Sequence, residues 1–196
     1  RSSAASDVYK RQGIKYEFRT KLTLTNDTKV YGTGLFPDGG KLRYDIPAIL
    51  SAGFEYKILQ SLRFASGFHY YFDKDAVIES APGVKKDIEG NLYEIAAGLE
   101  YDITDKILVS AGYLYAKTGV GKGFQTDLTH SLTSNTVGFG GMFKVNDNLS
   151  LELAGLFTMY NSDSKEIDYS AYGVPSAIET YNRTNVLFSI GAAYKF

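Results

Sequence analysis

The sequence predicts an all-β fold, a transmembrane up-and-down antiparallel β-barrel, from three observations. Apolar and polar residues alternate through eight segments, as in strands whose two faces meet different surroundings. The apolar faces carry no charge, although 22% of all residues are charged, and a charge facing lipid at the bilayer midplane costs ~2–4 kcal/mol. The connections alternate between short turns and long loops, which is typical of a membrane barrel and not of a Greek-key sandwich.

The composition of the 196 residues excludes several other classes. No apolar run approaches the ~20 residues that a membrane-spanning helix needs. There is no cysteine, so neither a disulfide nor a thiolate metal site is expected, and the net charge of −1 makes no electrostatic case for nucleic acid. Tyrosine (16), phenylalanine (12) and glycine (20) are abundant and proline (4) is rare, which suits strands that bend and meet an interface.

The first twelve residues, RSSAASDVYKRQ, do not continue the pattern that follows them. They resemble a translated sequencing adapter, and the alternative is a natural disordered lead-in. We therefore divide the chain into a non-native or disordered lead-in, residues 1–12, and the C-terminal portion of a barrel, residues 13–196.

The eight strands are predicted at residues 13–25, 44–57, 61–72, 91–102, 106–117, 135–145, 149–160 and 185–196. The outward residues of the first four are Ile14, Tyr16, Phe18, Thr20, Leu22 and Leu24; Ala48, Leu50, Ala52, Phe54 and Tyr56; Leu62, Phe64, Ser66, Phe68, Tyr70 and Phe72; and Tyr93, Ile95, Ala97, Leu99 and Tyr101. Pro47 lies near the start of the second strand, where a missing backbone donor is tolerated.

The next three strands continue the same pattern. Their outward residues are Ile107, Val109, Ala111, Tyr113 and Tyr115; Val137, Phe139, Gly141, Phe143 and Val145; and Leu149, Leu151, Leu153, Gly155, Phe157 and Met159. Residues 103–105 and 146–148 are predicted short turns, by composition and spacing. Long loops are predicted at 73–90, 118–134 and 161–184, the second with a short helical turn within 124–130.

The last strand alternates most regularly and ends the chain on an aromatic residue, Phe196, two residues after Tyr194. Termini usually fray in water, so a soluble domain seldom ends on its own hydrophobic strand. An alternating final strand that ends in phenylalanine resembles the C-terminal signal that the assembly machinery of outer-membrane barrels reads. Tyr194 and Phe196 are therefore the candidate assembly signal, and the alternative is the last strand of a soluble sandwich.

The inner faces of the predicted strands carry many small residues. They include Ser51, Gly53, Ala65, Gly67, Ala96, Gly98, Ser110, Gly112, Gly138, Gly140, Ser189, Gly191 and Ala193. An eight-stranded barrel is just wide enough for its side chains to fill, so glycine and alanine at mid-height would leave it hollow. A wider barrel that holds a plug or a substrate path fits better, with these eight strands as its last part.

Three segments, 46–53, 94–104 and 134–141, together with the closing strands, resemble the FadL-type transporters of long-chain fatty acids and aromatic hydrocarbons. The resemblance covers about residues 13–196. It implies about eight C-terminal strands of a fourteen-stranded barrel in the outer membrane of a Gram-negative bacterium. The family also has an N-terminal hatch and an early strand with an inward kink, and neither matches a segment here. The implied partners are outer-membrane lipid, lipopolysaccharide and the barrel-assembly machinery, with the protein a monomer.

The candidate substrate-binding residues are Arg63 and His69, which share the inner face of one predicted strand. Arginine binds carboxylates with bidentate geometry, so the pair would suit a polar head group. The alternative is an ion-pair network of the wall, with Glu55, Glu94 or Glu100 on neighbouring strands. The inner faces also carry Lys144 and Glu152.

No catalytic residue, cofactor or metal site is predicted. Asp73 and Asp75 open a loop without a third acid at ligand spacing, so they are interpreted as solvated. Gly119, Gly121 and Gly123 lack the lysine and the strand–helix context of a phosphate-binding loop.

The leading function is passive uptake of hydrophobic small molecules, such as long-chain fatty acids or aromatic hydrocarbons. The alternative is a small structural or adhesin-like outer-membrane barrel. An outer-membrane enzyme is not expected, because neither His69 nor His130 has an evident Ser–His–acid arrangement.

Overall fold

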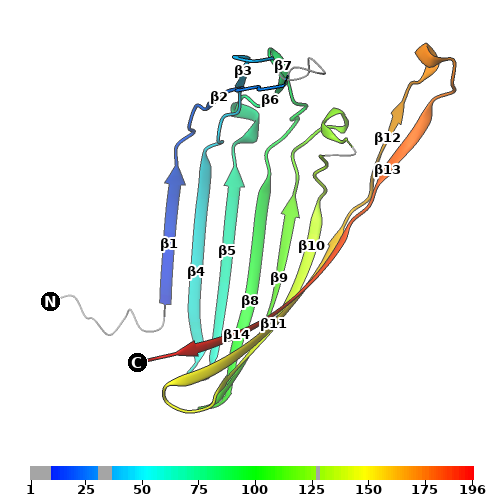
Figure 1. Cartoon of the computed structure of the whole chain (residues 1–196). Helices are drawn as coiled ribbons and strands as arrows, with labels where there is room; N and C mark the ends of the chain where they lie inside the picture. Colours follow the sequence, from blue (N-terminus) through cyan, green and yellow to red (C-terminus); the bar gives the residue numbers. More distant parts are fainter. Residues whose placement is uncertain (1–9, 31–36, 127–128) are drawn as a thin grey trace.

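The computed structural model describes residues 10–30, 37–126 and 129–196, so most of the predicted lead-in lies outside the described residues (Figure 1). One antiparallel sheet of eight strands dominates the described part of the chain. Its strands, in sheet order, are β1 (Lys10–Glu17), β4 (Ile49–Leu59), β5 (Leu62–Tyr71), β8 (Tyr93–Thr104), β9 (Ile107–Lys117), β10 (Ser134–Lys144), β11 (Leu149–Tyr160) and β14 (Thr184–Tyr194). Each strand pairs with its predecessor in this order, which confirms the predicted up-and-down sheet. No helix among the described residues is long and apolar enough to cross a membrane.

The connections alternate as predicted and define two ends of the sheet. Residues 60–61, 105–106 and 145–148 form the turn end, and the longer connections form the loop end (Figure 1). The described parts of the loops contain three small hairpins, formed by β2 (Thr23–Thr25) with β3 (Lys41–Arg43), β6 (Glu79–Ala81) with β7 (Val84–Lys85), and β12 (Asp163–Ile167) with β13 (Ala177–Tyr181). They also contain the single 3₁₀ turns η1 (Asp73–Asp75), η2 (Lys122–Phe124) and η3 (Ser170–Tyr172).

The first two strands differ from their predicted bounds. The alternation predicts a first strand at 13–25, but β1 begins at Lys10 and ends at Glu17, and residues 23–25 pair with β3 instead. The second strand is predicted from residue 44, but β4 begins at Ile49, after Pro47, which lacks a backbone donor. Ala48, predicted to face outward, is instead buried, with 6% of its surface exposed. The short turn predicted within 124–130 lies earlier, at η2, and residues 127–128 are outside the described part.

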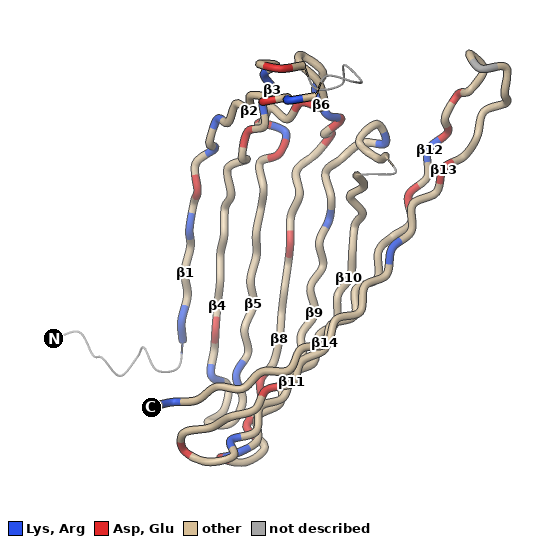
Figure 2. The backbone as a smooth tube through the Cα atoms, viewed as in Figure 1, with Lys and Arg blue, Asp and Glu red and all other residues tan. Residues whose placement is uncertain are grey.

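Cross-strand register places residues on two faces of the sheet, because directly paired residues share a face. Ile14, Ala52, Phe68, Ile95 and Tyr115 form one continuous outward row. The register therefore confirms the alternation predicted for β1, β4, β5, β8 and β9. In Figure 2 the middle of the sheet is largely free of charged residues, which gather toward its two ends and along β1. The outward charges of the sheet, Lys10 and Lys117, are strand-end residues.

The C-terminal strand ends at the turn end of the sheet (Figure 1). The backbone of Lys195 donates to the carbonyl of Asn148 (2.8 Å), and the side chain of Asn148 donates to the carbonyl of Lys195 (2.7 Å). The ring of Phe196 is fully exposed and meets the edge of Tyr194, with 5.2 Å between centroids. The exposed terminal ring therefore adds little packing to the described part of this chain.

We expect Phe196→Ser to lower the yield of assembled protein in cells sharply while changing stability by no more than ~1.5–3 kcal/mol, the value of one ring by area. The matched control is Phe188→Ser, because the ring of Phe188 lies on the outward face within β14, before the end of the strand, and is 84% exposed. Yield is measured as outer-membrane protein that shows heat-modifiable migration. Equal yields for the two variants would assign no signalling role to the terminal residue.

Candidate functional site

Small residues form a continuous band across the inner face of the sheet. Gly13, Gly53, Gly67 and Ala96 pair in one row. The next row toward the turn end consists of Ala65, Gly98, Gly112 and Gly138. A groove of about 430 Å³ lies over this second row and is bordered by Leu156, Glu55, Arg63 and Glu100. We call it the inner groove, and it is the hollow inner surface that the small residues predicted.

The glycines of this band differ in the space above them. A Cβ atom on Gly53 or Gly67 would have no heavy atom nearer than 4.0 Å. A Cβ atom on Gly98 would lie 3.2 Å from the carbonyl oxygen of Ala111, closer than an ordinary contact. Gly98 therefore allows the close approach of two strands, whereas Gly53 and Gly67 leave open space that a larger side chain would fill.

Arg63 lies on β5 at the turn-end border of the inner groove, and two acids of β8 hold its guanidinium. Its Nε is 3.0 Å from Oε2 of Glu100, and its Nη2 is 3.5 Å from Oδ1 of Asp102. Register explains the first contact, because Arg63 and Glu100 are directly paired across β5 and β8. The guanidinium of Arg63 is thus already paired with acids of the barrel wall.

His69 lies six residues further along β5, toward the loop end. Its Nδ1 is 3.2 Å from Oε2 of Glu94, and the hydroxyl of Tyr71 donates to the same oxygen at 3.3 Å. Six residues of strand span ~20 Å, so one carboxylate head group cannot contact both Arg63 and His69. Both residues therefore have the acidic partners that the alternative interpretation, an ion-pair network within the wall, predicted. A role of Arg63 and His69 in substrate contact stays a prediction.

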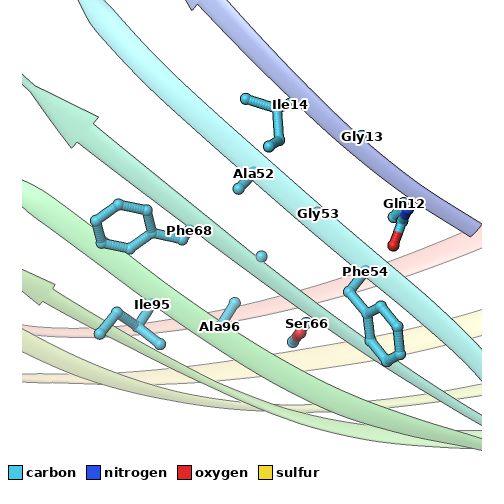
Figure 3. Close-up of a pocket in the computed structure, with 11 residues that line it drawn as sticks. Gln12, Gly13, Ile14, Ala52, Gly53, Phe54, Ser66, Phe68, Ile95 and Ala96 are labelled. Carbon is cyan, nitrogen blue, oxygen red and sulfur yellow. The ribbon is translucent and has the colours of Figure 1, made fainter.

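A larger groove lies on the other face of the sheet (Figure 3). It has a volume of about 700 Å³, and its side-chain walls include Ile14, Phe54, Phe68 and Ile95 over the small residue Ala52. These residues belong to outward rows by register. The backbone pairing beneath the groove is unbroken from β1 to β8. The larger groove is therefore a depression in the outer surface of the sheet and does not open into the inner groove.

The glycine run in the connection after β9 packs against the connection after β5. The amide of Gly123 donates to Oδ2 of Asp87 (2.8 Å), and the amide of Gly121 donates to the backbone carbonyl of Asp87 (3.1 Å). A Cβ atom on Gly121 would clash with that carboxylate, at 2.3 Å. The Nζ of Lys86 lies 5.7 Å from the ring centroid of Tyr44 and 5.1 Å from that of Phe124. The glycine run thus binds the side chain of Asp87, and larger residues would clash with this carboxylate. The contact accounts for the glycines without a phosphate ligand.

A buried carboxylate, Asp45, joins two connections at the loop end, and no sequence pattern points to it. Arg43 donates to it from Nη2 (2.6 Å) and Nε (3.2 Å), and the amides of Val77 (3.2 Å) and Leu22 (3.3 Å) complete the set. Burial by itself would raise the pKa of Asp45, but these hydrogen bonds and the charge of Arg43 hold that pKa below its ordinary value. Asp45 is therefore a charged anchor of the loops.

Asp73 and Asp75, the two acids of the predicted loop, lie in a 3₁₀ turn, and Asp73 is hydrogen-bonded within the chain. Burial raises the pKa of Asp73, although its Oδ2 accepts a hydrogen bond from the amide of Leu92 at 2.9 Å. Asp75 ends the 3₁₀ turn η1. Within residues 10–30, 37–126 and 129–196, no group of three or more His, Cys, Asp or Glu residues is placed to hold a metal ion.

A curved sheet of eight antiparallel strands with an apolar outer face and a small-residue inner face defines part of a β-barrel wall. No protein-family model matches the sequence, and no curated protein matches it. Among solved structures, a Pseudomonas aeruginosa FadL homologue matches with a TM-score of 0.71 and 14% identity, over 95% of this chain and 49% of that chain.

Two further solved structures agree with this match. The P. putida toluene transporter TodX gives a TM-score of 0.58 at 16% identity, over 96% of this chain and 46% of its own. The CymD monoaromatic hydrocarbon channel gives 0.57 at 15%, over 96% and 48%. The chain spans about half the length of these proteins. It has the fold of part of a FadL-type barrel, and the matches fit a C-terminal fragment of one.

Proposed function

We propose that the protein of which this chain forms part is an outer-membrane transporter for passive uptake of hydrophobic small molecules, such as aromatic hydrocarbons or long-chain fatty acids. The observation that carries the proposal is the hollow inner surface over the glycine and alanine band, where the charged side chains that the structure describes occur only at the border of the inner groove. The solved relatives include a toluene transporter and a monoaromatic hydrocarbon channel, which supports the same class.

The outer face supports residence in a lipid bilayer. Aromatic residues lie toward both ends of the strands, as Tyr93 and Tyr101 do on β8. The eight steps along the strand from Tyr93 to Tyr101 span ~27 Å, and a tilt of ~40° reduces this to ~20 Å of height, close to the ~25 Å apolar band of membrane barrels. The same proposal includes three further points. Lipopolysaccharide and outer-membrane lipid surround the wall, the assembly machinery binds the C-terminal strand, and the protein is a monomer.

The alternative function, a small adhesin-like barrel, requires these eight strands to close on themselves. In the described residues β1 and β14 are the two edges of the sheet and do not pair with each other. This observation favours a wall that further strands complete, and hence the transporter.

We expect Gly67→Leu in the full-length protein to reduce uptake of a labelled aromatic hydrocarbon several-fold, because the new side chain would fill open space over the small-residue band. Uptake is measured in cells, against cells that lack the protein. The matched control is Ala52→Leu, which adds bulk to the outward groove on the neighbouring strand. Equal loss in both variants would indicate damage to folding, and passage of sugars and ions without hydrocarbon uptake would identify a general porin.

A further inference from the structure

The lining of the inner groove contains one more carboxylate than cation. Its lining contains two carboxylates, Glu55 and Glu100, and one cation, Arg63, which gives a formal charge of −1. Charged residues beside this lining include Asp102, 3.5 Å from Arg63, and Lys57, which pairs with Arg63 across β4 and β5. Glu55 has its own cation, Arg11, at 4.0 Å, outside the groove lining.

The second polar cluster of the inner face repeats this arrangement. His69 is the basic member, and Glu94 accepts from both His69 and Tyr71 through one oxygen, Oε2. Each basic side chain that the sequence offers as a head-group contact is therefore already held by an acid of β8. No lining residue of the inner groove presents a cation free of a carboxylate partner, among the residues that the structure describes.

We propose that Glu100 and Asp102 are specificity-determining residues, which make this wall accept uncharged apolar molecules and reject carboxylates of the same size. The inference rests on the proposed transport function and narrows its substrate class. It assigns Arg63 to the wall, where its ion pairs hold the two acids in place.

The physical reason is that Arg63, the cation in the described lining of the inner groove, already has carboxylate partners. To reach Arg63, it would have to displace Glu100, whose bond to Nε is 3.0 Å long and charge-assisted. The displaced acid would then remain close to the incoming one, because Glu100 is tied to the same short stretch of wall. Burying an unpaired charge against glycine and alanine is costly, whereas an uncharged ring loses nothing there. Such a repulsive element is a common source of specificity.

The test compares toluene with benzoate, which share a ring and differ by the carboxylate. Uptake of each labelled compound is measured at pH 7 in cells that carry the full-length protein, against cells without it. The double variant Glu100→Gln with Asp102→Asn should raise benzoate uptake by up to about fivefold, the upper end of the range for exposed ion pairs, and leave toluene uptake unchanged. The matched control is Glu152→Gln, an inner-face acid outside the groove lining, which should change neither.

The outcomes separate this inference from the function on which it rests. The inference is supported if the wild type takes up toluene but not benzoate and the double variant gains benzoate uptake. Equal wild-type uptake of both compounds, or a double variant that folds and gains no benzoate uptake, overturns it but leaves the transport function standing. Uptake of a labelled long-chain fatty acid but not of toluene also overturns the inference alone, whereas uptake of none of the three compounds by the wild type overturns the proposed function itself. If the double variant fails to show heat-modifiable migration, Glu100→Gln alone is measured, with the same expected direction.

Discussion

Gly119→Ala should separate two connections at the loop end of the sheet. A Cβ atom on Gly119 would lie 2.4 Å from the carbonyl carbon of Gly90, 2.5 Å from its oxygen and 2.6 Å from the amide of Asn91. All three are backbone atoms, which cannot rotate away as the end of a side chain can. The substitution therefore requires the two chain segments to move apart.

The movement would break the hydrogen bonds that join these segments. The carbonyl of Gly119 accepts from the amides of Glu89 (3.0 Å) and Gly90 (2.7 Å). We expect a local destabilisation of ~1–3 kcal/mol, the usual cost of forcing extra atoms into a packed site, seen as faster proteolysis within 86–126. The matched control is Gly53→Ala, where the nearest heavy atom lies at 4.0 Å. Equal protease resistance of both variants and the wild type would show that this contact does not order the loops.

Alternation predicts the existence and the faces of the eight strands, although not all of their bounds. Each strand meets one face of similar chemistry along its whole length, so a period of two in the sequence is enough to assign its faces. The start of β1 shows the limit of this reasoning. Lys10 and Gln12 do not look like a barrel strand by composition, but they pair with Tyr56 and Phe54 of β4. Pairing with a neighbour decides their structure, and the division of the chain at residue 13 stays a prediction.

The polar contacts were predictable only as alternatives, because they depend on register. That Arg63 meets Glu100 and His69 meets Glu94 follows from the pairing of β5 with β8, which a sequence pattern does not provide. The loop contacts are harder still. Asp87 is separated by 36 residues from Gly123, whose amide it binds, and no local motif connects them. The glycine run is visible in the sequence, but its partner is not.

Asp45→Ala should destabilise the loop end more than Gly119→Ala does. The substitution removes the acceptor of four hydrogen bonds and leaves the amides of Val77 and Leu22 without this partner. The side chain of Asp45 is fully buried, whereas that of Arg43 is 38% exposed and can regain water. We therefore expect a loss of ~2–4 kcal/mol, near the lower end of the range for a broken buried pair.

The pH dependence of this contribution has a definite sign. Because the pKa of Asp45 in the folded protein lies below its ordinary value of 3.8, the unfolded chain binds the proton more readily. The stabilisation is fully present above about pH 3.8 and is lost as the pH falls through the folded pKa. Resistance of the loop end to an acid-active protease, followed from pH 7 to pH 2, should therefore fall in the wild type below that value.

The control for Asp45 is Asp27→Ala, an acid of the same connection whose side chain is 77% exposed and pairs with Lys29 at 2.7 Å. Removal of a surface pair of this kind changes stability by ~0–1 kcal/mol. Asp45→Ala should already be protease-sensitive at pH 7 and should change little on acidification, whereas Asp27→Ala should follow the wild type. If Asp45→Ala matched the wild type at pH 7, the hydrogen bonds to this carboxylate would not hold the loops together, and the acid sensitivity would have to come from other carboxylates.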